Sequence, residues 1–409
     1  MTWLLDLFTT GSITGSVLVI ALVAALGLAL GAVRVRGAGL GVAGVLFAGL
    51  LFGHLGVVVE PKVVEFARDF GLVLFVYAIG VAAGPGFLEP LRRHGIALNL
   101  VSIGNVLLGS VLAALIGRMA GIETPVAVGI LAGASTNTPS LGAAQTALRD
   151  LPGYTGQLGQ LPALGYAVSY PFGVVGIILA MIALRPLFRP RQAGAGVLDR
   201  SAGGGAEAEP EPAPSAGEPR VVRDAAPFQV LPIFIGIALG VLIGSIPFPV
   251  RGLPAPLRLG LAGGPLITAI ALSARERIGR LTWRMPAEAN VMLRDLGIAV
   301  FLACVGLIAG RRFVETLAEG DGLRWMLWGT VVTIVPTVLV AFAGRTLLKG
   351  HYAATCGLMA GCTTNPAALA FAATSTRSEA TTLTYATVYP LTMVLRVLST
   401  QLFVLLLMR

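Results

Sequence analysis

Two short polar motifs, each set within an apolar stretch, contain the residues best suited to bind a ligand. The first supplies Ser135, Thr136, Asn137 and Thr138 around Pro139, and the second supplies Thr363, Thr364 and Asn365 before Pro366. Proline suits the first turn of a helix, and Thr138 and Asn365 are placed as the N-cap residues before it. The free N–H groups and partial positive charge of a helix N-terminus favour an anion. The motifs therefore predict two half-helices that bind a carboxylate, unless they are ordinary polar loops outside a membrane.

Tyrosine and arginine side chains near these motifs are further candidate ligands. Tyr166 and Tyr385 each begin a Tyr-Ala-x-x-Tyr-Pro sequence, whose two tyrosines share one helix face. Their phenols would line a substrate path, anchor a helix at the membrane interface or pack against the motifs. Arg396 stands in the middle of an apolar segment, where a charge is costly. Its guanidinium suits a bidentate carboxylate, or it is a structural arginine that pairs with backbone carbonyls.

Two acidic residues and a polar stripe complete the set. Asp69 and Asp295 each follow an arginine at the start of an apolar segment, where they complement a helix dipole or couple transport to a proton. The stripe consists of Asn99, Ser102 and Asn105. It would face the first motif or form hydrogen bonds between helices, and Gln145 stands close enough in the chain to reach the same site.

The sequence contains no constellation typical of an enzyme. It has no glycine-rich phosphate loop followed by lysine, no His-x-x-x-His, no Gly-x-Ser-x-Gly and no paired aspartates within an apolar segment. Cys304, Cys356 and Cys362 are too few and too irregularly spaced for a metal site or a disulfide framework. We therefore expect a protein that is not an enzyme and holds neither a metal nor another cofactor.

The composition is that of a helical membrane protein. Of the 409 residues, 56% are hydrophobic and only 12% are charged, whereas about a quarter are charged in a soluble domain. The net charge of +9 comes almost entirely from arginine, placed mainly in gaps between apolar runs. Such arginines orient helices in a membrane, so the charge does not indicate a nucleic-acid partner.

A membrane-spanning helix needs about 20 largely apolar residues. Ten segments meet this requirement: 12–33, 38–59, 66–88, 96–118, 160–185, 227–246, 257–274, 293–313, 323–348 and 380–408. Two further apolar stretches, 124–148 and 352–375, are broken at their centres by the polar motifs. Each arm of these stretches is long enough to cross about half a membrane.

The segments form two blocks, 1–189 and 227–409, joined by 190–226. The joining region is rich in Gly, Ala, Glu, Pro and Ser, a composition that cannot bury enough apolar surface to fold. The blocks resemble each other: Arg68-Asp69 answers Arg294-Asp295 at an offset of 226, and Thr136-Asn137 answers Thr364-Asn365 at an offset of 228. Ordered matches of this kind indicate duplication. We therefore expect two membrane repeats around a disordered linker.

The two broken stretches decide the topology. If each enters and leaves on one side as a re-entrant hairpin, each repeat has five crossings and the repeats are inverted. If each crosses as a discontinuous helix, the repeats are parallel. The arginines favour inverted repeats with a cytoplasmic linker and both termini on the outer, periplasmic side.

The motifs also resemble a known family. Gly-Ala-Ser-Thr-Asn-Thr-Pro at 133–139 and Gly-Cys-Thr-Thr-Asn-Pro at 361–366 are similar to sequences in the duplicated membrane domains of the aspartate–alanine exchanger family. The resemblance covers nearly the whole chain outside the linker. It implies a bacterial inner-membrane carrier that exchanges amino-acid or dicarboxylate anions. Related carriers with paired re-entrant loops form homodimers and work by an elevator motion. Many members carry two potassium-channel-type regulatory domains where this chain has only 190–226.

Together, these features predict an all-α polytopic membrane protein with two inverted repeats, each of five transmembrane helices and one re-entrant hairpin or discontinuous helix. We expect an elevator-type secondary transporter that exchanges small carboxylates, such as aspartate, alanine or a dicarboxylate, held at the two motifs. Three alternatives remain. The paired half-helices would also suit an anion or ion channel, the same architecture would suit a proton- or sodium-coupled carboxylate symporter, and a membrane protein without transport activity is the third.

Overall fold

The structure is a computed structural model that describes residues 11–35, 38–39, 41–84, 95–188, 230–249, 256, 258–275, 277–278, 281–283, 285–318 and 321–408. The linker expected at 190–226 lies outside these residues. The helices are α2 (Ile13–Ala32), α3 (Gly44–His54), α4 (Pro61–Ala83), α6 (Ile96–Ala120), α7 (Thr124–Ala134), α8 (Thr138–Arg149), α9 (Leu161–Leu184), α10 (Leu231–Ser245), α11 (Gly260–Ser273), α12 (Ala287–Ala318), α13 (Asp321–Leu347), α14 (Tyr352–Cys362), α15 (Pro366–Thr376) and α16 (Glu379–Leu407). Two short antiparallel hairpins pair β1 (Arg34–Val35) with β2 (Ala38–Gly39) and β3 (Arg277–Ile278) with β4 (Leu281–Thr282).

Seven helices in the described part of the chain are long and apolar enough to cross a membrane. They are α2, α4, α6, α9, α12, α13 and α16. Helices α3, α10 and α11 stand where three further spans are expected, but they have 11, 15 and 14 residues, fewer than the roughly 20 that a span needs. The prediction of an all-α polytopic membrane protein is confirmed, while the ten-crossing topology stays a prediction.

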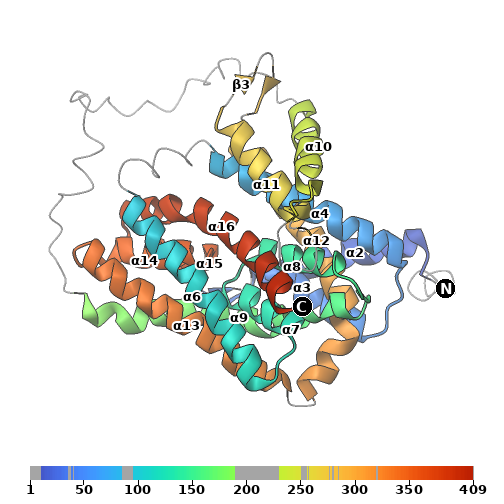
Figure 1. The fold of residues 1–409 in the computed structure, drawn as a ribbon, viewed down its shortest axis with the longest axis horizontal. Helices are drawn as coiled ribbons and strands as arrows, with labels where there is room; N and C mark the ends of the chain where they lie inside the picture. Colours follow the sequence, from blue (N-terminus) through green and yellow to red (C-terminus); the bar gives the residue numbers. More distant parts are fainter. Residues whose placement is uncertain are drawn as a thin grey trace, which may run out of the picture.

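The helices pack as two groups (Figure 1). Helices α2, α3, α4, α10, α11 and α12 contact mainly one another and form the α4–α12 group. Helices α6, α7, α9, α13, α14 and α16 do the same and form the tip group. The first three helices of each repeat therefore lie in one group and the later helices in the other. Helix α8 contacts both groups, whereas α15 contacts α9, α14 and α16 of the tip group.

Repeat equivalents meet where α4 crosses α12. A Cβ atom on Gly71 would lie 2.8 Å from the carbonyl oxygen of Gly297, and a Cβ on Gly297 would lie 2.7 Å from that of Gly71. Contacts this short exclude any larger residue, so small residues let the two backbones approach closely. The glycine faces of α2 and α10 also pack within the chain, because Gly27 contacts Val45 and Gly240 contacts Pro265.

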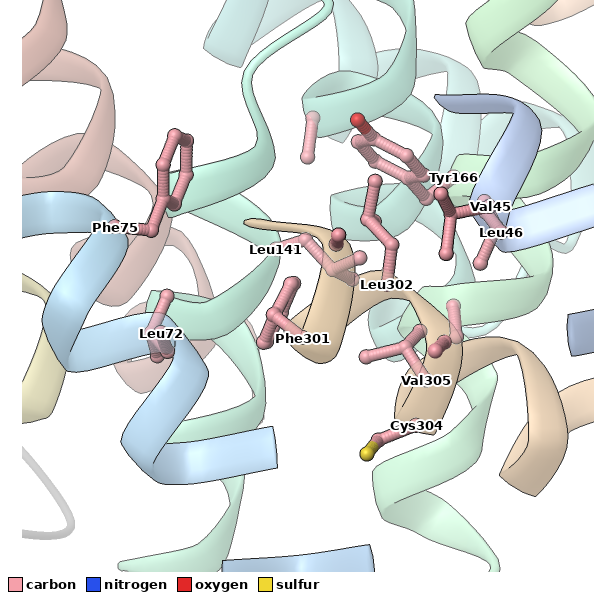
Figure 2. Close-up of a cluster of buried hydrophobic side chains, with 14 of the residues drawn as sticks. Val45, Leu46, Leu72, Phe75, Leu141, Tyr166, Phe301, Leu302, Cys304 and Val305 are labelled. Carbon is pink, nitrogen blue, oxygen red and sulfur yellow. The ribbon is translucent and has the colours of Figure 1, made fainter. Parts of the chain in front are cut away.

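A continuous apolar core joins the two groups, as Figure 2 shows. Its members are at most 8% exposed and include Leu72 and Phe75 of α4, Leu141 of α8, Tyr166 of α9, and Phe301 and Leu302 of α12. Helix α8 is thus held firmly against the α4–α12 group, which fixes the position of the first polar motif.

Candidate substrate-binding site

The two polar tips, residues 135–137 and 363–365, lie against each other. Thr136 donates a hydrogen bond from Oγ1 to the carbonyl oxygen of Thr363 (3.0 Å), and Thr364 donates from Oγ1 to the carbonyl oxygen of Ser135 (3.1 Å). These bonds are repeat equivalents, since residue 136 answers 364 and residue 135 answers 363. All four residues are at most 8% exposed. The structure therefore joins two motifs that lie 227 to 229 residues apart in the chain.

The tips share one backbone conformation. Thr136 and Thr364 adopt the left-handed region, with φ of 51° and 52°, which is uncommon for a β-branched residue. Each threonine follows the C-cap residue of the first arm, α7 or α14, and the next residue is the N-cap of the second arm. Asn137 and Asn365 are these caps, and each Oδ1 accepts a hydrogen bond of 2.9 Å from the third amide of its helix.

The prediction that Thr138 caps its arm is wrong. Asn137 is the N-cap of α8, and Thr138 is the first helical residue, with Pro139 second. A proline is tolerated at either position because the amides of the first turn have no partner within the helix. The motif with Pro366 has one residue fewer before its proline, so Asn365 is correctly placed. Alignment of the two asparagines, rather than of the two prolines, would have identified both caps.

Each tip is also held by a helix of the other repeat. Asn105 of α6 donates from Nδ2 to the carbonyl oxygen of Cys362 (2.9 Å), and Thr333 of α13 donates from Oγ1 to that of Ala134 (3.0 Å). Both bonds fit the offset of 228. Asn105 was expected at the first motif or between helices, and it reaches the second. Sequence analysis missed Thr333, although the offset from Asn105 points to it.

The other members of the polar stripe, and Gln145, form hydrogen bonds that hold the helices in place. Ser102 pairs with Thr392 of α16, and Asn99 donates to the carbonyl oxygen of Gly95 at the start of its own helix. Gln145 donates from Nε2 to the carbonyl oxygen of Gly159 (3.2 Å). None of these side chains belongs to the lining of the large cavity described next.

A cavity of about 1180 Å³ lies between the α4–α12 group and the tip group. Helices α2, α4 and α12 line one side, and α9, α15 and α16 line the other. Among the predicted site residues, its lining includes Thr136, Thr138, Pro139, Thr364, Asn365, Pro366, Tyr385 and Asp295. The structure thus brings most of the predicted ligands to one cavity, with the meeting point of the tips at its wall.

Asn365 is the buried donor of this wall that lacks a partner. Its Nδ2 forms no hydrogen bond with the described residues, and the side chain is 1% exposed. Its repeat equivalent Asn137 is satisfied, because its Nδ2 donates to Thr364 Oγ1 (3.0 Å) and contacts Met393 Sδ (3.1 Å). Asn137 is fully buried and is not part of the cavity lining. One of two equivalent amides is therefore free to bind a ligand.

The tyrosines of the two repeats differ in the same way. Tyr166 is fully buried and its hydroxyl pairs with Thr138 Oγ1 (2.8 Å). Tyr385 lines the cavity and stacks on Tyr389, with ring centroids 4.9 Å apart. Tyr170, which also lines the cavity, lies 5.3 Å from the Tyr166 ring. Tyr385 is thus placed to meet a ligand, whereas Tyr166 positions Thr138.

Arg396 lies behind the tips rather than on the cavity wall. Its Nη2 donates to the carbonyl oxygen of Cys362 (2.7 Å), and the side chain is 5% exposed. With Ser135 and Thr363 it borders a second, much smaller space. This is the arrangement that a structural arginine would have. A direct contact between Arg396 and substrate stays a prediction.

The two candidate coupling acids occupy unlike surroundings. Asp69 accepts from Arg149 Nη1 (2.8 Å) and from Arg68 Nε (3.0 Å). Asp295 lines the cavity and is bonded to the adjacent Arg294, with 2.9 Å from Nε to Oδ1. Tyr154, in the loop after α8, lies near Asp69, and burial raises the pKa of its phenol. Sequence analysis missed Arg149.

No group of three or more His, Cys, Asp or Glu residues comes together within the described ranges. Cys304, Cys356 and Cys362 are free and buried. Buried free cysteines of this kind act as small packing residues.

Comparison with known proteins now identifies the family. A family model described as "Predicted Permease Membrane Region", that of the aspartate–alanine exchangers, matches residues 19–186 and 232–405. The chain belongs to this family. A protein of Aeromonas hydrophila named "Putative transport protein" is 35% identical, with 96% of this chain and 98% of the relative covered. A Klebsiella pneumoniae protein of the same description is 34% identical, with 95% and 97% covered.

The family model matches the chain in two segments, one on each side of the expected linker. The two matched segments leave out residues 187–231, which include the expected linker. The alignment with the Aeromonas protein spans 547 residues, more than the 409 of this chain, so that relative carries residues that this chain lacks. The chain is a multi-pass membrane transport protein rather than an enzyme.

Proposed function

We propose that this permease is a secondary active transporter that exchanges small carboxylate anions and binds them where the two tips meet the cavity. Asn365 carries the proposal. Asn365 belongs to the lining, and its buried Nδ2 has no partner among the described residues. Such a donor costs about 1–3 kcal/mol. A carboxylate oxygen would recover that free energy, and the N-terminus of α15 adds partial positive charge beside it.

The remaining lining suits an amino acid or a dicarboxylate. The hydroxyls of Thr136 and Thr138 and the phenol of Tyr385 offer further hydrogen bonds to a small polar ligand. Aspartate, alanine and dicarboxylates of similar length are the substrates that the family name suggests. The volume leaves room for water beside such a molecule, as expected when a carrier is open on one side.

The burial of α8 supports a carrier over an open channel. On the side of the tips away from the cavity, α8 has ten of its twelve residues buried, and Asp69 is paired with Arg149. A channel would need a continuous path, whereas a carrier exposes its site to one side at a time.

The charges of the sequence suggest that the cavity opens to the cytoplasm. Its lining includes the ends of α2 and α4 and the beginning of α12, at Ala32, Ala83 and Asn290. Arginines follow the first two helices and precede the third, at Arg34, Arg36, Arg92, Arg93, Arg275, Arg277, Arg280 and Arg284. Positive residues favour the cytoplasmic side. The proposal includes an inner-membrane location with a cytoplasmic linker, periplasmic termini, a homodimer, and an elevator motion of the tip group.

Counterflow in proteoliposomes tests the function. Vesicles are loaded in turn with aspartate, glutamate, succinate, malate or alanine, and uptake of each labelled solute is followed with and without a membrane potential, a proton gradient or sodium. We expect saturable uptake that a trans solute stimulates. If none of these solutes stimulates uptake, carboxylate exchange is wrong. Uptake driven by an ion gradient alone would instead indicate a symporter, and conductance far above carrier rates would indicate a channel.

A substitution at Asn365 tests the site. Asn365→Ser keeps a hydroxyl cap for α15 but removes the amide donor. We expect trans-stimulated uptake to fall about tenfold, which corresponds to the loss of about 1.4 kcal/mol of binding free energy. Asn99→Ser is the matched control, because Asn99 is also buried but lies off the cavity, and its side chain bonds, among the described residues, to Gly95, the N-cap of α6. Equal rates for the two variants would exclude Asn365 from the site.

A further inference from the structure

The closed side of the molecule is held by an ion pair between the second arm of the first motif and α4. Arg149, the last residue of α8, reaches Asp69 with 2.8 Å from Nη1 to Oδ2 and 3.4 Å from Nη2 to Oδ1. The side chains are 25% and 29% exposed. Two nearly parallel hydrogen bonds between a guanidinium and a carboxylate form one of the stronger polar contacts in proteins. This pair joins α8 to the α4–α12 group.

The second repeat contains the same two charges, but there they are apart. Arg377 answers Arg149 at the offset of 228, and Asp295 answers Asp69 at the offset of 226. Among the described residues, Asp295 is bonded only to its neighbour Arg294, and its side chain is 43% exposed. Arg377 is exposed, follows α15 with φ of 48°, and forms no ion pair with the described residues. The cavity lies between the helices that carry this separated pair, α15 and α12.

Apolar residues on the helices that carry the two pairs of charges differ in the same way: they are in contact on the closed side and line the cavity on the other side. On the closed side, Gly142 of α8 packs against Leu72 of α4. Their repeat equivalents, Ala370 of α15 and Ile298 of α12, both line the cavity. The arrangement of α8 on α4 is therefore a template for the way in which α15 would lie on α12 after closure.

We infer that Arg377 and Asp295 form the second gate of the transporter, which pairs when the cavity closes and Arg149 separates from Asp69. This inference rests on the proposed function, because a gate has a role only if the protein alternates between two accessible states. Exchange of one ion pair for an equivalent one keeps the two states similar in free energy, so that a bound substrate shifts the balance easily. It also explains why the same charges recur at corresponding positions of the two repeats.

Paired cysteines test the gate directly. Asp295→Cys with Arg377→Cys forms one reporter, and Asp69→Cys with Arg149→Cys forms the other, each in the full chain in liposomes with a short bifunctional thiol reagent. The three native cysteines are buried, and the unsubstituted chain gives the background. We expect cross-links in both reporters, with aspartate or another exchanged solute changing their yields in opposite directions. No cross-link between positions 295 and 377 under any condition, with a cross-link between 69 and 149, would overturn the gate.

Charge variants separate gating from binding. Arg377→Ala is expected to slow counterflow at least fivefold while half-saturation by substrate changes less than twofold, because Arg377 does not line the cavity. Arg377→Asp combined with Asp295→Arg restores the pair in reverse and should recover most of the rate. Failure of the reversed pair to recover any activity, with both single variants folded, contradicts the proposal. Opposed cross-link yields without carboxylate counterflow would keep the gate and reject the substrate class.

Discussion

Helices α8 and α15 follow tips of nearly the same sequence, yet they occupy different surroundings. Ten of the twelve residues of α8 are buried, whereas only Ala368 and Ala372 of α15 are buried among eleven. The tips themselves match in backbone angles, caps and reciprocal hydrogen bonds. The repeated sequence thus determines the local geometry of each tip, and the helices packed against each second arm determine how much of that arm faces the cavity.

The difference also appears in single side chains. Asn137 has all its polar atoms engaged within the protein, and its equivalent Asn365 has a free amide. Asp69 is paired across helices, and its equivalent Asp295 faces the cavity. In both comparisons, the side chain of the first repeat bonds within the protein and its equivalent in the second repeat lines the cavity. This division is what a carrier with two equivalent repeats would show in one of its two states.

The same substitution in the two caps should separate these roles most clearly. Asn137→Ala removes the cap of α8 and the buried bond to Thr364, for a loss of about 2–4 kcal/mol in the free energy of unfolding. Asn365→Ala removes a cap worth about 0.5–2 kcal/mol. It also removes the unpaired Nδ2, whose burial costs about 1–3 kcal/mol, so we expect little net loss. Denaturant unfolding in detergent micelles, followed by circular dichroism, gives both values. Equal losses would mean that the two tips are energetically alike.

A serine variant checks the cause of that difference. Asn137→Ser restores a capping oxygen without restoring the contact with Thr364, so about half of the lost stability should return. Recovery to the original stability would show that the bond between the tips contributes little, and the distinction between Asn137 and Asn365 would then rest on exposure alone.

The cross-repeat bonds are expected to contribute less. Thr333→Val replaces by a methyl group a hydroxyl whose one proton is shared between the carbonyls of Ala134 (3.0 Å) and Gly329 (2.9 Å), so we expect a loss of about 1 kcal/mol at most. Thr330→Val is a matched control in the same helix, because among the described residues Thr330 bonds only to the carbonyl of Met326, four residues before it, as Thr333 does to Gly329. A loss for the control as large as that for Thr333→Val would assign the effect to helix propensity. Thermal unfolding of the two variants side by side provides the comparison.

The sequence predicts elements better than it predicts contacts between them. Apolar length, proline and asparagine act locally, so they predict the breaks at the two motifs and the ends of most long helices. The repeat offsets can be read directly from the matching residues. Three expected spans are short in the structure. The length of an apolar run does not show that α3 begins only after the 3-10 turn Gly41–Ala43. It also does not show that α11 begins at Gly260, whose backbone is left-handed.

The partners of the site residues depend on packing that no local pattern contains. Arg396 was placed correctly within an apolar helix, but its contact with the carbonyl of Cys362 depends on how α16 lies against α14. The inequality of Asn137 and Asn365 is invisible in two nearly identical motifs. Two residues were within reach of the sequence, because the offset of 228 leads from Asn105 to Thr333 and from Arg149 to Arg377.

The smallest expected effect concerns the contact between Gly142 of α8 and Leu72 of α4. A Cβ atom on Gly142 would lie 2.6 Å from Leu72 Cδ2, and because that atom ends a flexible side chain, Gly142→Ala should weaken the closed side by only about 0.5–1 kcal/mol. That corresponds to a two- to fivefold shift in the ratio of the two states. The fully buried Leu141, changed to cysteine, reports it through its rate of labelling by an impermeant maleimide. Gly104→Ala is the control, because a Cβ there meets open space. If Gly142→Ala leaves the labelling rate unchanged, the cover over α8 does not depend on this contact, and the difference between the two arms must come from their ion pairs instead.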